Sequence, residues 1–143
     1  NRGISGDTTE GVLARLAEII YYKPEQVFIL IGINDLFRDD MTSEKVFNNI
    51  LKIVDQIHHG SPRTEIFVQT ILPTNTVKLK EKIQSTNSLL TSSEATEPYK
   101  LISLHPHFAT QDDIMNMELS ADGVHLNENG YAVWVDKIIN LIH

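Results

Sequence analysis

The sequence contains no cysteine, and this absence removes several functions at once. A chain without thiols has no disulfide framework, no cysteine nucleophile and no thiolate ligand for a metal. Runs of Lys and Arg are also missing, and the formal net charge is -7. Since there is no surplus of positive charge to neutralise phosphates, we predict no nucleic-acid partner.

Long apolar runs are missing as well. None approaches the roughly 20 residues that a membrane-spanning helix needs, so we predict no membrane span. The sequence starts with Asn1 and gives no information on a signal peptide, so the compartment stays open. The 143 residues, 41% of them hydrophobic, have the composition of one globular domain.

Helical and strand-like patterns alternate along the chain, which is typical of an α/β fold with a parallel sheet. Helices are predicted over 7–22, 43–60, 77–90 and from 127 onward. Continuous apolar runs predict buried strands at 26–32, 65–72 and 99–104. The segment 104–127 has little periodicity and is predicted to be a loop, which in compact α/β domains often carries function.

Two details of the helices can be tested against a structure. Asp7, with Glu10 three residues later, is predicted to cap the first helix. The last helix is predicted to bury an apolar stripe. The stripe consists of Tyr131, Trp134, Val135, Ile138, Ile139 and Ile142.

Three short segments could bring chemistry to one crevice beyond the carboxyl ends of the strands. Asp122 precedes His125 by three residues, so its carboxylate can hold the imidazole in one tautomer and stabilise the imidazolium, which makes a general-base unit. The N–H of Gly6 lies near a predicted helix N-terminus, and Asn34 offers a neutral N–H₂ after a strand. Two such donors suit a developing oxyanion, so the pattern indicates acyl transfer if a nucleophile exists.

Each segment also has a purely structural interpretation. Gly6 can belong to a strand-to-helix turn, Asn34 can cap a turn, and an Asp-x-x-His pair can lie on the surface. Asp35 and Arg38 are assigned to a helix start and to surface charge.

The histidines of the long loop suggest a metal site only weakly. His105 and His107 have Asp112 and Asp113 nearby, but no third well-placed ligand accompanies them. We therefore assign them as loop histidines and predict no metal and no cofactor.

The segments "SGDTT", "GIND" and "DGVHLN", in this order, resemble the second, third and fifth conserved blocks of the SGNH hydrolases. These enzymes are also called GDSL esterases or lipases and include acylhydrolases, acetylhydrolases and sialate O-acetylesterases. The resemblance implies a flavodoxin-like three-layer α/β/α domain that hydrolyses a short acyl ester, most plausibly an acetyl ester on a carbohydrate or lipid. It also implies that Gly6 and Asn34 form the oxyanion hole, that His125 is the general base and that Asp122 orients it.

One block of that family is missing. Its Gly-Asp-Ser motif, which holds the nucleophilic serine, does not occur in this sequence. Ser5 is the nearest hydroxyl, but it precedes the oxyanion donor and does not lie at a strand-end elbow, so it is not a convincing substitute. The resemblance implies that the serine lies upstream, that residues 1–143 form a single domain incomplete at its N-terminus, and that this chain alone is inactive.

The missing block also implies missing first strands. Their loss would leave the strand at Val27–Ile31 as an exposed apolar edge, which invites pairing or aggregation. We therefore expect this edge to be covered by a longer chain or by a partner in an oligomer.

Three functions remain open on the sequence. The first is an SGNH-type serine esterase acting on a small-molecule or glycan ester. The second is a non-catalytic carbohydrate-binding relative whose gene lacks the serine. The third is a flavodoxin-like phosphate binder that uses the turn at Ser5–Thr9 as an anion cradle, but this leaves the pair of Asp122 and His125 without a role.

Overall fold

A parallel three-stranded sheet forms the centre of the computed structural model, which describes residues 2–143. The strands are β1 (Gln26–Ile29), β2 (Glu65–Gln69) and β3 (Lys100–Ile102), in the order β1-β2-β3. β2 pairs with both neighbours in parallel. The prediction of an α/β fold with a parallel sheet is confirmed.

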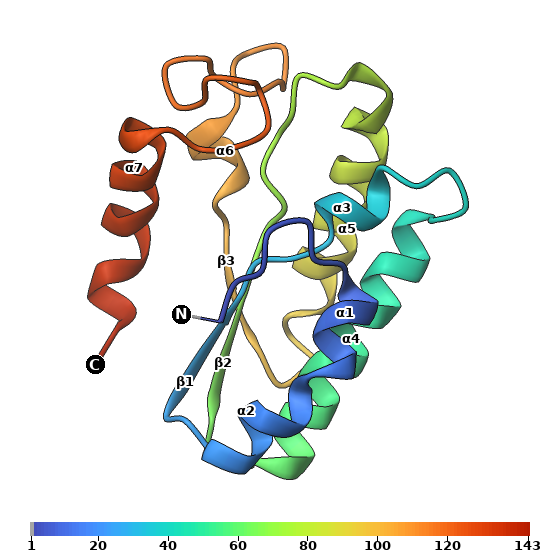
Figure 1. Cartoon of the computed structure of the whole chain (residues 1–143), viewed down its shortest axis with the longest axis vertical. Helices are drawn as coiled ribbons and strands as arrows, with labels where there is room; N and C mark the ends of the chain where they lie inside the picture. The colour runs from blue at the N-terminus through green and yellow to red at the C-terminus, as the bar shows by residue number, and fades with distance from the viewer. Residues whose placement is uncertain (1) are drawn as a thin grey trace.

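Helices cover both faces of this sheet (Figure 1). On one face lie α1 (Thr9–Ala14), α2 (Leu16–Tyr22), α4 (Ser43–Gly60) and α5 (Lys80–Ser93). On the other face lies α7 (Glu128–Ile138), with α6 (His105–Phe108) above the end of β3. Three short helices complete the chain, namely α3 (Ile33–Leu36) and the 3-10 helices η1 (Val77–Leu79) and η2 (Ile139–Leu141). The arrangement is therefore three-layered.

Alternation along the strands separates two hydrophobic clusters. In β2, Ile66 and Val68 belong to the cluster formed with α1, α2, α4 and α5. Phe67 points to the other face, where its ring stacks on Phe28 of β1 with centroids 4.7 Å apart. Because β-strand side chains alternate between faces, each strand is buried on both sides and reads as a continuous apolar run.

The start of the chain differs from the prediction in two ways. The first helix is broken at Arg15, which ends α1 with φ -118° and ψ 9°. The Arg15 side chain turns back to donate hydrogen bonds to the Asp7 carboxylate and to the carbonyl oxygen of Arg2. The cap is Thr8, whose hydroxyl accepts from the N–H of Gly11 at 3.2 Å. The prediction of Asp7 as the cap is wrong because its carboxylate is held by Arg15.

Most other boundaries lie within a few residues of the predictions. Thr42 caps α4 by accepting from the N–H of Lys45, and Asn127 caps α7 by accepting from Gly130. The strands are shorter than the apolar runs that predicted them, because each run continues past the sheet into the turn that follows. The segment predicted as a loop contains the short helix α6.

The largest disagreement concerns α7. Trp134 and Ile138 pack against the sheet, but the other four members of the predicted buried stripe are about half exposed. These four are Tyr131, Val135, Ile139 and Ile142. Their predicted burial is wrong because no strand lies beyond the edge of β1 among residues 2–143, so nothing packs under that side of α7.

An apolar cavity of about 570 Å³ lies along this edge of β1. Side chains from α1, α2, β1 and α7 line it, among them Leu16, Ile19, Val27 and Ile138. Within residues 2–143, no helix has both the length and the apolar character needed to cross a membrane.

Candidate active site

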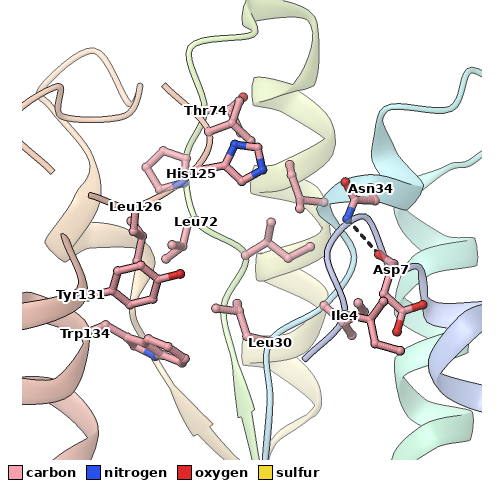
Figure 2. A pocket seen from close by; sticks show the side chains of 15 residues that line it. Ile4, Asp7, Leu30, Asn34, Leu72, Thr74, His125, Leu126, Tyr131 and Trp134 are labelled. Atoms are coloured by element: carbon pink, nitrogen blue, oxygen red, sulfur yellow. Dashed lines mark hydrogen bonds between the residues drawn. The ribbon is translucent and has the colours of Figure 1, made fainter. Parts of the chain in front are cut away.

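Segments far apart in the sequence meet around one cavity at the carboxyl end of the sheet (Figure 2). The cavity has a volume of about 280 Å³. Asp7, Asn34 and His125 contribute polar groups to its wall. The remaining wall is mostly apolar and includes Leu30, Leu72, Leu126, Tyr131 and Trp134. The three segments that were expected to converge are therefore brought together.

The turn around Gly6 supplies one side of this site. Gly6 has φ +75°, a conformation that residues with a Cβ rarely adopt. A Cβ added there would meet no atom within 4 Å, so backbone conformation and not space favours glycine. Gly6 is exposed and adjoins Asp7, which lines the cavity, although Gly6 itself is not among the lining residues.

Asn34 faces this turn from α3. Its Nδ2 donates a hydrogen bond to the backbone oxygen of Asp7 at 2.9 Å, drawn as a dashed line in Figure 2. That bond uses one of the two hydrogens on Nδ2 and fixes the plane of the amide. The second hydrogen can therefore serve a ligand in the cavity. Gly32, with φ +120°, makes the sharp turn that leads from β1 into α3.

His125 and Asp122 form a hydrogen-bonded pair on the opposite side. His125 Nδ1 lies 2.7 Å from Asp122 Oδ2, and the other carboxylate oxygen accepts from the N–H groups of Val124 and His125. The hydrogen bond from the His125 side chain, followed by those from the two N–H groups, holds the pKa of Asp122 well below its ordinary value. A neutral His125 therefore carries its proton on Nδ1 and leaves Nε2 as the acceptor.

The loop that carries this pair is held by residues that the motifs do not include. Ser120 is fully buried, and its hydroxyl donates to the backbone oxygen of His125 at 2.6 Å and accepts from the N–H of Gly123 at 2.9 Å. Gly123 in turn accepts a hydrogen bond at its carbonyl oxygen from the N–H of Asn75. No periodicity or spacing in the sequence pointed to Ser120 or Asn75.

Asp35 lies in the first turn of α3, as expected for a helix start, but it is not a surface charge. Its exposed fraction is 0%, because its carboxylate turns inward to Thr9. Arg38 is exposed as expected and forms an ion pair with Asp40 at 2.9 Å.

The remaining candidates lie away from the cavity. Ser5 is exposed and does not line it. His105 is not an open loop histidine: its Nε2 lies 2.6 Å from Asp113 and its Nδ1 lies 2.8 Å from the carbonyl oxygen of Ile71. His107 is exposed. Over residues 2–143, His, Asp and Glu side chains nowhere gather in a group of three or more that could hold a metal ion.

Comparison with known proteins places the chain in a family. Residues 1–133 match the GDSL-like Lipase/Acylhydrolase family. No curated protein matches the sequence.

Solved structures of this family share the fold. A candidate acylhydrolase from Bacteroides fragilis is 24% identical, with a TM-score of 0.89 over 98% of this chain and 72% of its own. A GDSL-like lipase from Bacteroides thetaiotaomicron is also 24% identical, with a TM-score of 0.83 over 98% of this chain and 73% of its own. The lipase/acylhydrolase from Enterococcus faecalis is 25% identical, with a TM-score of 0.76 over 96% of this chain and 71% of its own. With its sequence match, its three-layer fold and these neighbours, the chain belongs to the GDSL-like lipase/acylhydrolase family of ester hydrolases.

Proposed function

We propose that this chain carries the general base and the oxyanion hole of a serine esterase that removes a short acyl group, namely acetyl, from a carbohydrate or lipid. The observation that carries the proposal is that His125, oriented by Asp122, and Asn34, fixed by Asp7, line one cavity. A base and a neutral hydrogen-bond donor at one cavity are the groups that acyl transfer requires.

The roles follow from the hydrogen bonds. A serine hydroxyl attacks the ester carbonyl carbon while Nε2 of His125 takes the hydroxyl proton. The Gly6 N–H and the free Nδ2 hydrogen of Asn34 stabilise the oxyanion, together with the N–H of the serine itself. His125 then returns the proton to the leaving alcohol, and water releases the acid in the second half of the cycle. Asp122 stabilises the imidazolium that forms in both halves.

The serine is proposed to lie in a segment that precedes Asn1. Two observations support this. The free edge of β1 and the apolar cavity beside it have the form of a place for another strand, and parallel strands present their carboxyl ends at the same side of a sheet. The matched structures are also longer, since this chain accounts for 72% of the Bacteroides fragilis protein. On this proposal residues 1–143 are an incomplete domain and have no turnover alone.

The acetyl preference rests on the fold alone. Structures of the same fold include an acetyl-xylooligosaccharide esterase from Geobacillus, 19% identical, and an acetyl xylan esterase, 16% identical. The fold therefore hosts hydrolysis of acetyl esters on carbohydrates in other proteins.

The test is to produce the chain together with the coding sequence that precedes Asn1. The protein is treated with a fluorophosphonate, the intact mass and the labelled peptide are measured, and hydrolysis of p-nitrophenyl acetate is followed. We expect one adduct on a serine upstream of Asn1. His125→Ala should lower turnover by at least about 1,000-fold, because a triad without its base retains only binding and oxyanion stabilisation.

Two other outcomes would change the proposal. Turnover that survives in His125→Ala would show that another group is the base. A preceding segment without a reactive serine would favour the non-catalytic carbohydrate-binding relative. Binding of acetylated xylooligosaccharides without turnover would then identify it.

A further inference from the structure

Asp35 is a fully buried carboxylate for which the proposed mechanism has no use. Its exposed fraction is 0%. Within residues 2–143, no Lys, Arg or His nitrogen lies within ion-pair distance, 4.0 Å, of its oxygens. A buried charge without a counter-ion is costly unless hydrogen bonds compensate for the lost water. The structure must therefore supply those hydrogen bonds, and where they go indicates what the carboxylate does.

Among the described residues, Thr9 alone donates hydrogen bonds to this carboxylate. The Thr9 N–H lies 2.9 Å from Oδ2 and 3.2 Å from Oδ1 of Asp35, and the Thr9 hydroxyl donates to Oδ1 at 2.5 Å. The same hydroxyl accepts from Nδ2 of Asn49 on α4 at 2.9 Å. The network therefore joins α1, α3 and α4, and its bonds to the Asp35 carboxylate are of the charge-assisted kind.

Two of the three residues in this network, Thr9 and Asp35, lie close in the sequence to the proposed oxyanion donors. Thr9 is the first residue of α1 and follows the Gly6 turn, while Asp35 directly follows Asn34. On the cavity side, the same two turns are joined by the hydrogen bond from Asn34 to the Asp7 carbonyl oxygen. That second link uses the side chain that would also serve the substrate. The link from Asp35 to Thr9 is buried and independent of any ligand.

We infer that Asp35 is a positioning residue that sets the separation of the two oxyanion donors, Gly6 N–H and Asn34 Nδ2, by binding Thr9. The inference rests on the proposed function for those donors. An oxyanion hole works because its donors are held in place before charge develops, and small misplacements are expensive. Since Gly6 and Asn34 come from separate turns, a rigid bond between the turns is needed to keep their spacing.

Substitutions at both ends of the bond test this inference. Asp35→Asn keeps the size of the side chain but turns one acceptor into an N–H₂ group that faces the donors of Thr9. Thr9→Val removes the hydroxyl, whereas Thr9→Ser keeps a hydroxyl at this position. In the protein that includes the preceding segment, we expect kcat to fall between about 10-fold and 100-fold in the first two variants, with KM changed by less than about 3-fold. Thr9→Ser should retain most of kcat.

A matched control separates positioning from loss of stability. Thr86 is also a fully buried threonine, its hydroxyl donates to the carbonyl oxygen of Lys82 within α5, and it does not line the cavity. Thr86→Val should lower the melting temperature but leave kcat per active site unchanged. Active sites are counted with the fluorophosphonate, so a loss of folded protein is not mistaken for a loss of kcat.

A second readout does not depend on turnover. In ¹⁵N–¹H spectra, the Gly6 amide and the Asn34 side-chain amide should shift in Asp35→Asn and stay in place in Thr86→Val. Unchanged resonances, or a kcat that stays at the wild-type value per active site, would overturn the inference. If the wild-type protein neither hydrolyses esters nor takes the label, the proposed function fails, and the spectra still decide whether Asp35 sets the spacing.

Discussion

Asn34 and Asp35 are adjacent in the chain but lie in opposite surroundings. The Asn34 side chain lines the cavity, whereas the Asp35 carboxylate is buried and does not line it. A short helix such as α3 presents consecutive side chains in different directions, so one turn can place a donor at the site and an anchor in the core. At the scale of single residues, the site therefore depends on which way each side chain points.

Asn34→Ala tests the proposed donor directly. We expect kcat to fall by about 100-fold with little change in KM, because a donor to an oxyanion acts mainly in the transition state. The measurement is steady-state hydrolysis of p-nitrophenyl acetate by the protein that includes the preceding segment. A change in KM alone would instead assign Asn34 to binding of the ground state.

At the scale of helices and strands, the ends of the helices set the positions of the site residues. α4, the longest helix, packs on α1, α2 and α5, and it holds Asn49 against Thr9. Its start is fixed by the Thr42 hydroxyl, which accepts from the N–H of Lys45 at 3.2 Å. The helix that holds Thr9 through Asn49, close to the Gly6 turn, therefore has its own start fixed by a local cap.

Thr42→Ala should lower the free energy of unfolding by about 1 kcal/mol, because it removes the acceptor for an otherwise unpaired helix N–H. Urea unfolding followed by circular dichroism measures this change. Thr91→Ala is the control, since Thr91 is exposed within α5 and alanine is the better helix former there. Equal losses in the two variants would show that the cap contributes nothing specific.

At the scale of the whole molecule, His105 links the end of β2 to the long loop. His105 bridges the carbonyl oxygen of Ile71, just past β2, and the carboxylate of Asp113, which also accepts from Gln84. Burial raises the pKa of Asp113, but the hydrogen bonds from His105 and Gln84 outweigh it and leave the pKa below its ordinary value. Asp113 has φ +58°, which asparagine also tolerates.

Because the folded state lowers the pKa of Asp113, its contribution to stability is present above the unfolded value, about 3.9, and is lost as pH falls through the folded value. Asp113→Asn should therefore be less stable than the wild type at pH 7, and the difference should narrow toward pH 3. Urea unfolding across this range tests it, with Asp112→Asn as the control for loss of a charge from the same loop. A constant difference across the range would show that ionisation of Asp113 does not stabilise the fold.

The free edge of β1 predicts how the chain alone behaves in solution. An unpaired apolar edge beside half-exposed residues of α7 is a surface on which strands associate. We expect residues 1–143 to associate increasingly with concentration, and the protein with its preceding segment to do so far less. Sedimentation velocity compares the two. Equal association would show that the preceding segment does not cover this edge.

The sequence by itself determined the fold class, the order of the main helices and strands, and the three segments that reach the cavity. These follow from local causes, since apolar periodicity, helix caps and sharp turns act over a few residues. The starts of α4 and α7 were placed in this way, and so was the convergence of the segments that carry Asp7, Asn34 and His125 at the strand ends. The roles proposed for these residues stay predictions until they are measured.

Only the tertiary structure decided which polar side chains turn inward and which apolar ones stay uncovered. Asp35 looked like a surface charge because its partner, Thr9, lies 26 residues away. The cap at Thr8 replaced Asp7 because Arg15 holds the Asp7 carboxylate, and α7 is half exposed because no strand lies under that side of it among the described residues. Each outcome depends on contacts between distant parts of the chain, and local patterns carry no information about such contacts.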